Sequence, residues 1–67
     1  MFLRVPYPGG SEQLVHVHLI STVMRPEDAP LREPPPPEVR SVVQLRNGDR
    51  MLCTRSYEEL ETILQAF

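Results

Sequence analysis

An Asn-Gly pair between two β-rich runs places the strongest constraint on how this chain can fold. Asn47-Gly48 separates residues 39–45, which contain three valines, from residues 50–54, a mainly apolar run that ends in threonine, and valine and threonine favour strands. Asn-Gly is the favoured pair for the two-residue type I′ turn, because both central residues of that turn need positive φ. The sequence therefore predicts an antiparallel hairpin centred on Asn47-Gly48.

The type I′ turn also predicts a register for this hairpin. Leu45 would lie opposite Arg50, and Val43 opposite Leu52. Because alternate residues of a strand share a face, Val43, Leu45 and Leu52 would then form its core face.

A C-terminal helix over residues 57–67 is indicated by a capping box. Ser56 can accept a hydrogen bond from the Glu59 amide, and the Glu59 side chain can reach back to Ser56. Apolar residues follow at helical spacing and would form a stripe that packs on the sheet. This stripe comprises Tyr57, Leu60, Ile63 or Leu64, and Phe67.

The N-terminal part of the chain alternates in the manner of strands. Residues 2–7 predict an edge strand and residues 8–11 a turn rich in proline and glycine. Residues 12–24 form a second extended stretch that is long for one strand, so we expect a bend near residues 18–20 and a short third strand after it. Along a straight strand, one face would carry Val15, Val17 and Leu19.

Prolines interrupt residues 26–38, with Pro26, Pro30 and an unbroken run at 34–37. This segment predicts an exposed loop with polyproline II character in its second half. The fold class expected for the whole chain is α+β. Residues 1–67 would form a single domain with a small antiparallel sheet of four or five strands and one C-terminal helix packed on one face.

A domain of 67 residues buries only about 60% of the surface of its unfolded chain, so its stability is marginal without support. The single cysteine, Cys53, excludes an internal disulfide, which leaves a metal or self-association as support. The lone cysteine, the lack of a signal-peptide pattern and the lack of a long apolar run lead us to expect a cytoplasmic protein with no membrane contact.

Residues that could perform chemistry are few. His16 and His18, with Cys53 on another strand, resemble part of a zinc site, but only Glu12 or the loop could add a fourth ligand. Cys53 has no evident base to activate it as a nucleophile. We therefore expect no catalytic residue, no metal, no cofactor and no small-molecule substrate.

The order of these motifs resembles the FlbD-like family of short bacterial and phage-encoded proteins. The matching pieces are residues 19–23 (Leu-Ile-Ser-Thr-Val), 46–49 (Arg-Asn-Gly-Asp) and 56–60 (Ser-Tyr-Glu-Glu-Leu). The resemblance covers nearly the whole chain except residues 26–38, where the family has only a few residues. It implies a short protein of bacterial or phage origin, and it carries over no catalytic residue.

A fainter similarity connects the chain to the LytTR-type DNA-binding domain, which is also a β fold. It rests on Arg4-Val5 and Ile20, and only when the two ends of the chain are taken in permuted order. This similarity implies a second hypothesis, nucleic-acid binding.

We expect first a protein-interaction module that binds and modulates a host or regulatory protein. We also expect the chain to form a homodimer through an edge strand or the helix. The expected contact set combines the loop with one sheet face. It comprises Arg32, Pro34, Pro35, Pro36, Pro37, Arg40, Gln44 and Met51.

The alternative is a nucleic-acid-binding transcriptional regulator with an arginine-bearing sheet face. All seven basic residues are arginines, but a net charge of −2 does not favour a phosphate-binding surface. The residues expected to serve this alternative are Arg4, Arg40, Arg46, Arg50 and Arg55.

Overall fold

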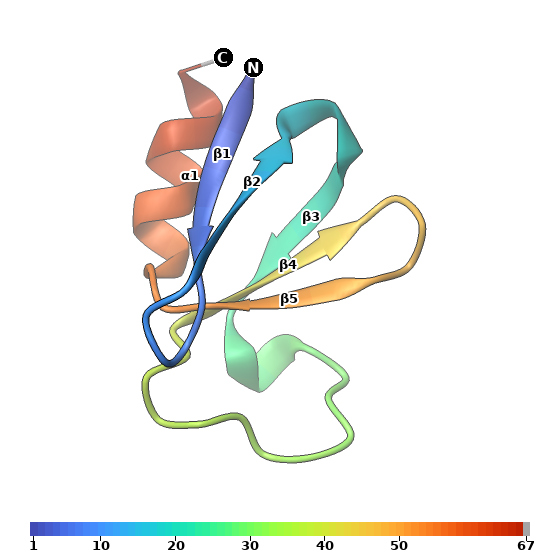
Figure 1. The fold of residues 1–67 in the computed structure, drawn as a ribbon. Helices are drawn as coiled ribbons and strands as arrows, with labels where there is room; N and C mark the ends of the chain where they lie inside the picture. The colour runs from blue at the N-terminus through green and yellow to red at the C-terminus, as the bar shows by residue number, and fades with distance from the viewer. Residues whose placement is uncertain (67) are drawn as a thin grey trace.

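The computed structural model describes residues 1–66 of the chain. It contains two antiparallel sheets and one C-terminal helix, so the expected α+β class with five strands is confirmed (Figure 1). The strands do not form one sheet, however, but divide into a pair and a group of three. Their bounds are β1 Phe2–Pro6, β2 Glu12–His16, β3 Ile20–Met24, β4 Ser41–Leu45 and β5 Arg50–Cys53, and helix α1 spans Tyr57–Gln65.

Strands β1 and β2 form a hairpin with one side turned toward the protein interior. Leu3 and Val5 on β1 and Val15 on β2 are buried, whereas their even-numbered neighbours point outward. The connecting turn uses Gly9 and Gly10, both with positive φ, a conformation that costs glycine nothing. The alternation in the sequence is therefore the alternation of a half-buried sheet.

A short 3-10 helix, Val17–Leu19, separates β2 from β3. It confirms the expected bend and third strand. It also shows that grouping Leu19 with Val15 on one strand face was wrong, because Leu19 lies in this turn and is 53% exposed, whereas Val17 still packs against the core that contains Val15. The His16 side chain stabilises this turn by accepting a hydrogen bond from the His18 amide at 3.2 Å.

Strands β4 and β5 form the expected hairpin, but the turn differs from the type I′ prediction. Gly48 has φ of +95°, whereas Asn47 does not have positive φ. The Leu45 amide donates to the Asp49 carbonyl at 2.8 Å, and the Asn47 side chain accepts from the Asp49 amide at 2.9 Å. Three residues, 46–48, thus occupy the loop, the arrangement in which a left-handed glycine follows an ordinary turn.

The longer loop shifts the predicted register by one residue. Val43 lies opposite Met51, and Val42 lies opposite Leu52. A shift of one residue moves every side chain of a strand to the other face. Met51 and Cys53 are consequently buried beside Val43, and Leu52, predicted for the core, is only half-buried.

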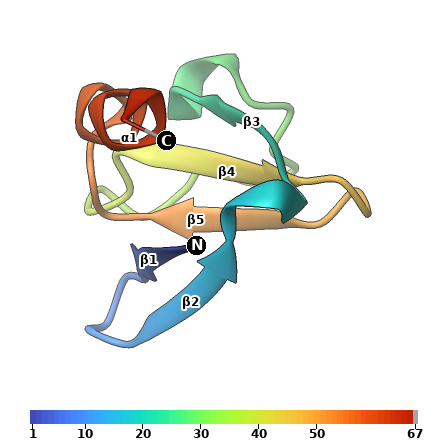
Figure 2. The same ribbon diagram turned by 90° about the horizontal axis from the view of Figure 1, so that it is seen from above.

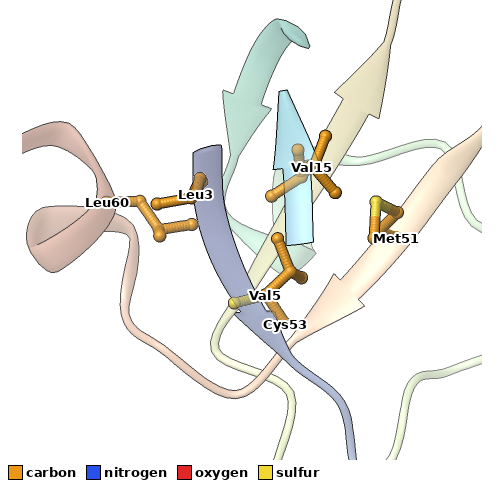
Figure 3. Packing of buried hydrophobic residues seen from close by; sticks show 7 residues of the cluster. Leu3, Val5, Val15, Met51, Cys53 and Leu60 are labelled. Atoms are coloured by element: carbon orange, nitrogen blue, oxygen red, sulfur yellow. The ribbon is translucent and has the colours of Figure 1, made fainter. Parts of the chain in front are cut away.

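One hydrophobic core joins both sheets and the helix (Figure 3). The two sheets meet where the Thr54 amide, just after β5, donates to the Pro6 carbonyl at 3.0 Å. Seen from above, β3, β4, β5, β1 and β2 follow one another across the molecule (Figure 2). The buried cluster comprises Leu3, Val5, Val15, Val43, Met51, Cys53 and Leu60.

Helix α1 begins as the capping box predicts. The Ser56 side chain accepts a hydrogen bond from the Glu59 amide at 3.1 Å. The helix packs against β3, and Figure 3 shows fully buried Leu60 pointing toward Leu3 on β1. The predicted stripe member Phe67 lies outside the described residues.

The segment between β3 and β4 extends away from both sheets in Figure 1. It contains a 3-10 helix, Pro26–Asp28, and its proline run ends in a turn in which the Val39 amide donates to the Pro36 carbonyl at 3.0 Å. Val39 is 7% exposed and anchors the end of the loop. Within residues 1–66, no helix has both the length and the apolar character needed to cross a membrane.

Candidate functional site

The contact set predicted from the sequence is only partly at the surface. Arg32 and Arg40 are exposed and Gln44 is half-buried, but Met51 is 6% exposed and belongs to the core. Naming Met51 as a contact residue was wrong because the two-residue turn implied the wrong register. Of the prolines in this set, Pro34, Pro36 and Pro37 are exposed and Pro35 is half-buried.

A groove at the base of the loop includes Arg40, and contacts among its lining residues join the loop to the helix. Arg25 forms an ion pair with Glu58 at 3.2 Å, and its guanidinium lies 4.4 Å from the centre of the Tyr57 ring. Hydrogen bonding to the helix backbone, followed by the Arg25 contact, lowers the pKa of Glu58. Arg25 thus ties the loop to the start of α1. No local sequence pattern indicates this pairing, because Arg25 and Glu58 are far apart along the chain.

The five arginines predicted for nucleic acid are not gathered on one surface. Arg46 and Arg50 lie at the turn of the β4–β5 hairpin, whereas Arg40 and Arg55 flank its opposite end. Arg4 lies on the other sheet, facing outward from β1. Arg55 is also 4.0 Å from Glu59, which offsets part of its charge.

The histidines and the cysteine that resembled part of a zinc site are separate. His16 and His18 stack with ring centres 5.0 Å apart at the end of β2, while Cys53 is fully buried in the core. Among residues 1–66, no three histidine, cysteine or acidic side chains are close enough together to hold a metal ion.

The β1–β2 hairpin and the 3-10 turn that follows it carry the exposed large hydrophobic side chains of the described chain. Met1 is 62% exposed, Phe2 60%, Leu14 60% and Leu19 53%. Phe2 and Leu14 share the outer side of the hairpin with Arg4, Glu12 and His16, because even-numbered residues of both strands point away from the core. We call these five residues the outer hairpin face.

Aromatic contacts organise one end of the outer hairpin face. The Phe2 ring meets the His16 ring edge to face at 5.2 Å. Partial burial lowers the pKa of His16 first, and the positive charge of the nearby Met1 amino group and His18 lower it further. The His16 Nε2 atom lies 3.5 Å from the Met1 nitrogen. His16 therefore favours its neutral, stacking form.

A second hollow, of about 390 Å³, lies between β3 and α1. Ile20, Val23 and Leu64 contribute apolar lining, and Glu61 beside Tyr57 contributes charge. Hydrogen bonding to the Glu61 carboxylate and repulsion from it raise the pKa of Tyr57. The hollow is open to solvent, and among the described residues only this tyrosine–glutamate pair brings ionisable groups to its lining.

Sequence reasoning did not single out Phe2 and Leu14. The signal was nevertheless present in the strand alternation. Once Leu3, Val5 and Val15 are assigned to the core, the apolar residues between them must face outward. A group of exposed apolar residues on one side of a strand pair is more informative than a single one, because contiguous apolar patches are uncommon on monomeric proteins.

The fold and its surface define a small α+β protein with an exposed apolar hairpin. Comparisons of the chain with protein-family models, with curated proteins and with solved structures found no match. The resemblance to the FlbD-like family therefore stays a hypothesis that rests on the sequence motifs alone.

Proposed function

We propose that this chain is a non-enzymatic protein-interaction module that binds a partner protein through the outer hairpin face. The observation that carries the proposal is the concentration of Met1, Phe2, Leu14 and Leu19 on one hairpin and the turn that follows it. Single exposed hydrophobic residues are common, but a group of them rimmed by polar side chains is typical of an interaction site.

The arrangement of the face suits protein recognition. Phe2 opposes His16 and Arg4 opposes Leu14, so Phe2 and Leu14 are diagonal neighbours on the same side of the sheet. Arg4 and Glu12 add charges of opposite sign beside this apolar pair. An aromatic and an aliphatic anchor within a polar rim are the usual composition of a protein-protein hot spot.

Catalysis is not part of the proposal, because the reactive groups are far apart or enclosed. Cys53 has no exposed surface, and the nearest histidines are on the hairpin. Nucleic-acid binding is supported less well than protein binding, since the arginines are divided among the two ends of β4–β5 and the outer side of β1.

The test compares the outer hairpin face with the loop predicted from the sequence. Proteins retained by the purified chain would first be identified, and the dissociation constant of each purified candidate would then be measured. We expect Phe2→Ser and Leu14→Ser each to weaken binding about 5- to 30-fold, because each removes roughly 1–2 kcal/mol of apolar burial.

The matched control replaces residues 27–37 with a short glycine-serine linker and should leave this affinity within about two-fold. If the linker variant loses binding while both hairpin variants keep it, the contact surface is the loop and the proposal is wrong. Tight binding to DNA or RNA that weakens steeply with salt, with no protein partner bound, would favour the nucleic-acid alternative.

A further inference from the structure

Strand β2 has an edge without a strand partner in the described chain. It pairs with β1 on one side, in a sheet of only these two strands. Figure 2 shows β2 along an outer margin of the molecule. An edge of this kind presents free N–H and carbonyl groups to which another strand can bind.

The hydrogen bonds of the hairpin identify which groups are free. The Val17 amide donates to the Met1 carbonyl at 3.0 Å, and the Tyr7 amide donates to the Ser11 carbonyl at 2.7 Å. These bonds show that the backbone N–H and carbonyl groups of the odd-numbered residues of β2 point toward β1. In an antiparallel pair the direction alternates along the strand. The backbone groups of Glu12 and Leu14 and the amide of His16 therefore point to the free edge.

The other strand edges are protected in ways that β2 is not. Strand β3 has an irregular register between Ile20 and Thr22, and α1 packs against it. The end of β5 is tied to β1 by the bond from Thr54 to the Pro6 carbonyl. Bulges, covering helices and prolines are the usual means of blocking an edge. Strand β2 contains none of these.

We infer that the β2 edge is a self-association site, at which β2 pairs antiparallel with β2 of a second copy about a two-fold axis at Leu14. The two Leu14 residues would exchange N–H···O bonds, and each His16 amide would donate to the Glu12 carbonyl of the other copy. The result is a continuous four-stranded sheet, an isologous arrangement of the kind that closes after two copies.

The side chains at this edge are complementary to themselves. With the two-fold axis at Leu14, Glu12 of each copy faces His16 of the other, and the two Leu14 side chains face each other. Opposite charges or hydrogen-bonding partners stabilise directly opposed positions, and like charges there destabilise them. Glu12 has no ion-pair partner among residues 1–66, so its carboxylate is available for this contact.

Pairing would also double the outer hairpin face. Phe2 and Leu14 of one copy would lie on the same side of the sheet as Leu14 and Phe2 of the other. The inference nevertheless stands apart from the proposed function, because self-association is measured on the purified chain with no partner present. One pair of short strands makes a small interface, so we expect a weak, concentration-dependent dimer.

The test is sedimentation of the purified chain at rising concentration, up to about 1 mM, with two charge variants. Glu12→Arg places a guanidinium opposite His16, and His16→Glu places two carboxylates opposite each other. We expect each variant alone to self-associate about ten-fold more weakly than the parent chain, because Glu12→Arg replaces the hydrogen-bond acceptor opposite His16 with a donor and His16→Glu opposes two like charges. Both positions lie on the outer side of the hairpin, and far-UV circular dichroism would confirm that the fold is retained.

The decisive arm mixes the two variants in equal amounts. In a mixed pair, arginine at position 12 faces glutamate at position 16, and the parent Glu12–His16 contact forms at the other end. We expect association in the mixture to return to at least the parent level. A parent chain that stays monomeric, variants that associate like the parent, or a mixture that stays monomeric would each overturn the inference.

Discussion

His16 combines three roles on the β1–β2 hairpin. Its ring lies against Phe2 and stacks on His18, and its Nδ1 atom accepts the His18 amide. Partial burial disfavours the charged form of the ring and so lowers the pKa of His16, and protonation would also add a positive charge beside the Met1 amino group and His18. These surroundings make the charged form less favourable in the folded protein than in the unfolded chain.

The lowered pKa of His16 predicts how stability depends on pH. The unfolded state binds the proton more readily than the folded state. The contribution of His16 to the free energy of unfolding is therefore complete above the ordinary histidine pKa of 6.5, and it is lost as the pH falls toward the lower pKa of the folded protein. We expect a histidine titration by NMR, on dilute protein, to give a pKa for His16 below that ordinary value. His16→Gln should reduce the loss of stability in this pH range. A pKa for His16 at or above 6.5 would contradict the contacts described.

At the scale of elements, the β4–β5 turn decides which residues form the core. Gly48 alone adopts positive φ in this turn, and the loop of residues 46–48 places Met51 rather than Leu52 beside Val43. The sequence predicted that a hairpin would form here. The register that it predicted was wrong by one residue, because Asn-Gly is compatible with both two-residue and three-residue loops, which differ by one position.

Matched truncations of Met51 and Leu52 test the observed register. Met51→Ala should lower the free energy of unfolding by about 2–4 kcal/mol, since it opens a cavity in the core. Leu52→Ala should cost roughly 1 kcal/mol or less, because Leu52 is half-buried. Urea unfolding of both variants measures the difference. A larger loss for Leu52→Ala than for Met51→Ala would contradict the observed register and would support the two-residue turn, in which Met51 lies at the surface.

The start of α1 illustrates an element that the sequence predicted well. The capping box is a local signal, since Ser56 and Glu59 are three residues apart, and the Ser56 cap formed as expected. The contact of Arg25 with Tyr57 and Glu58 is also part of this helix start, but it depends on how the loop returns to the helix. Interactions of that range are set by the tertiary fold and leave no local pattern.

For the whole molecule, the sequence predicted the elements better than their arrangement. The five strands and the helix follow from alternation, turn residues and capping, which act over a few positions. The division into two sheets depends on the 3-10 turn at Val17–Leu19 and on the Thr54–Pro6 contact, which joins residues distant in sequence. The contact surface that we propose differs from the one expected from the sequence for a related reason. The proline-rich loop was predicted as a contact surface because of its composition. Phe2 and Leu14 can be recognised as exposed residues only once the core face of the hairpin is known.

Site-specific photo-crosslinking in cells that express the chain tests most directly whether the outer hairpin face is where partners bind. A photoreactive phenylalanine would replace Leu14 in one variant and Thr62, an exposed residue on α1, in a control. We expect position 14 to yield a covalent adduct with a different protein and position 62 to yield none. A third variant would carry the photoreactive residue at Pro34 in the loop. Adducts at position 62 or position 34, with none at position 14, would contradict the proposed surface.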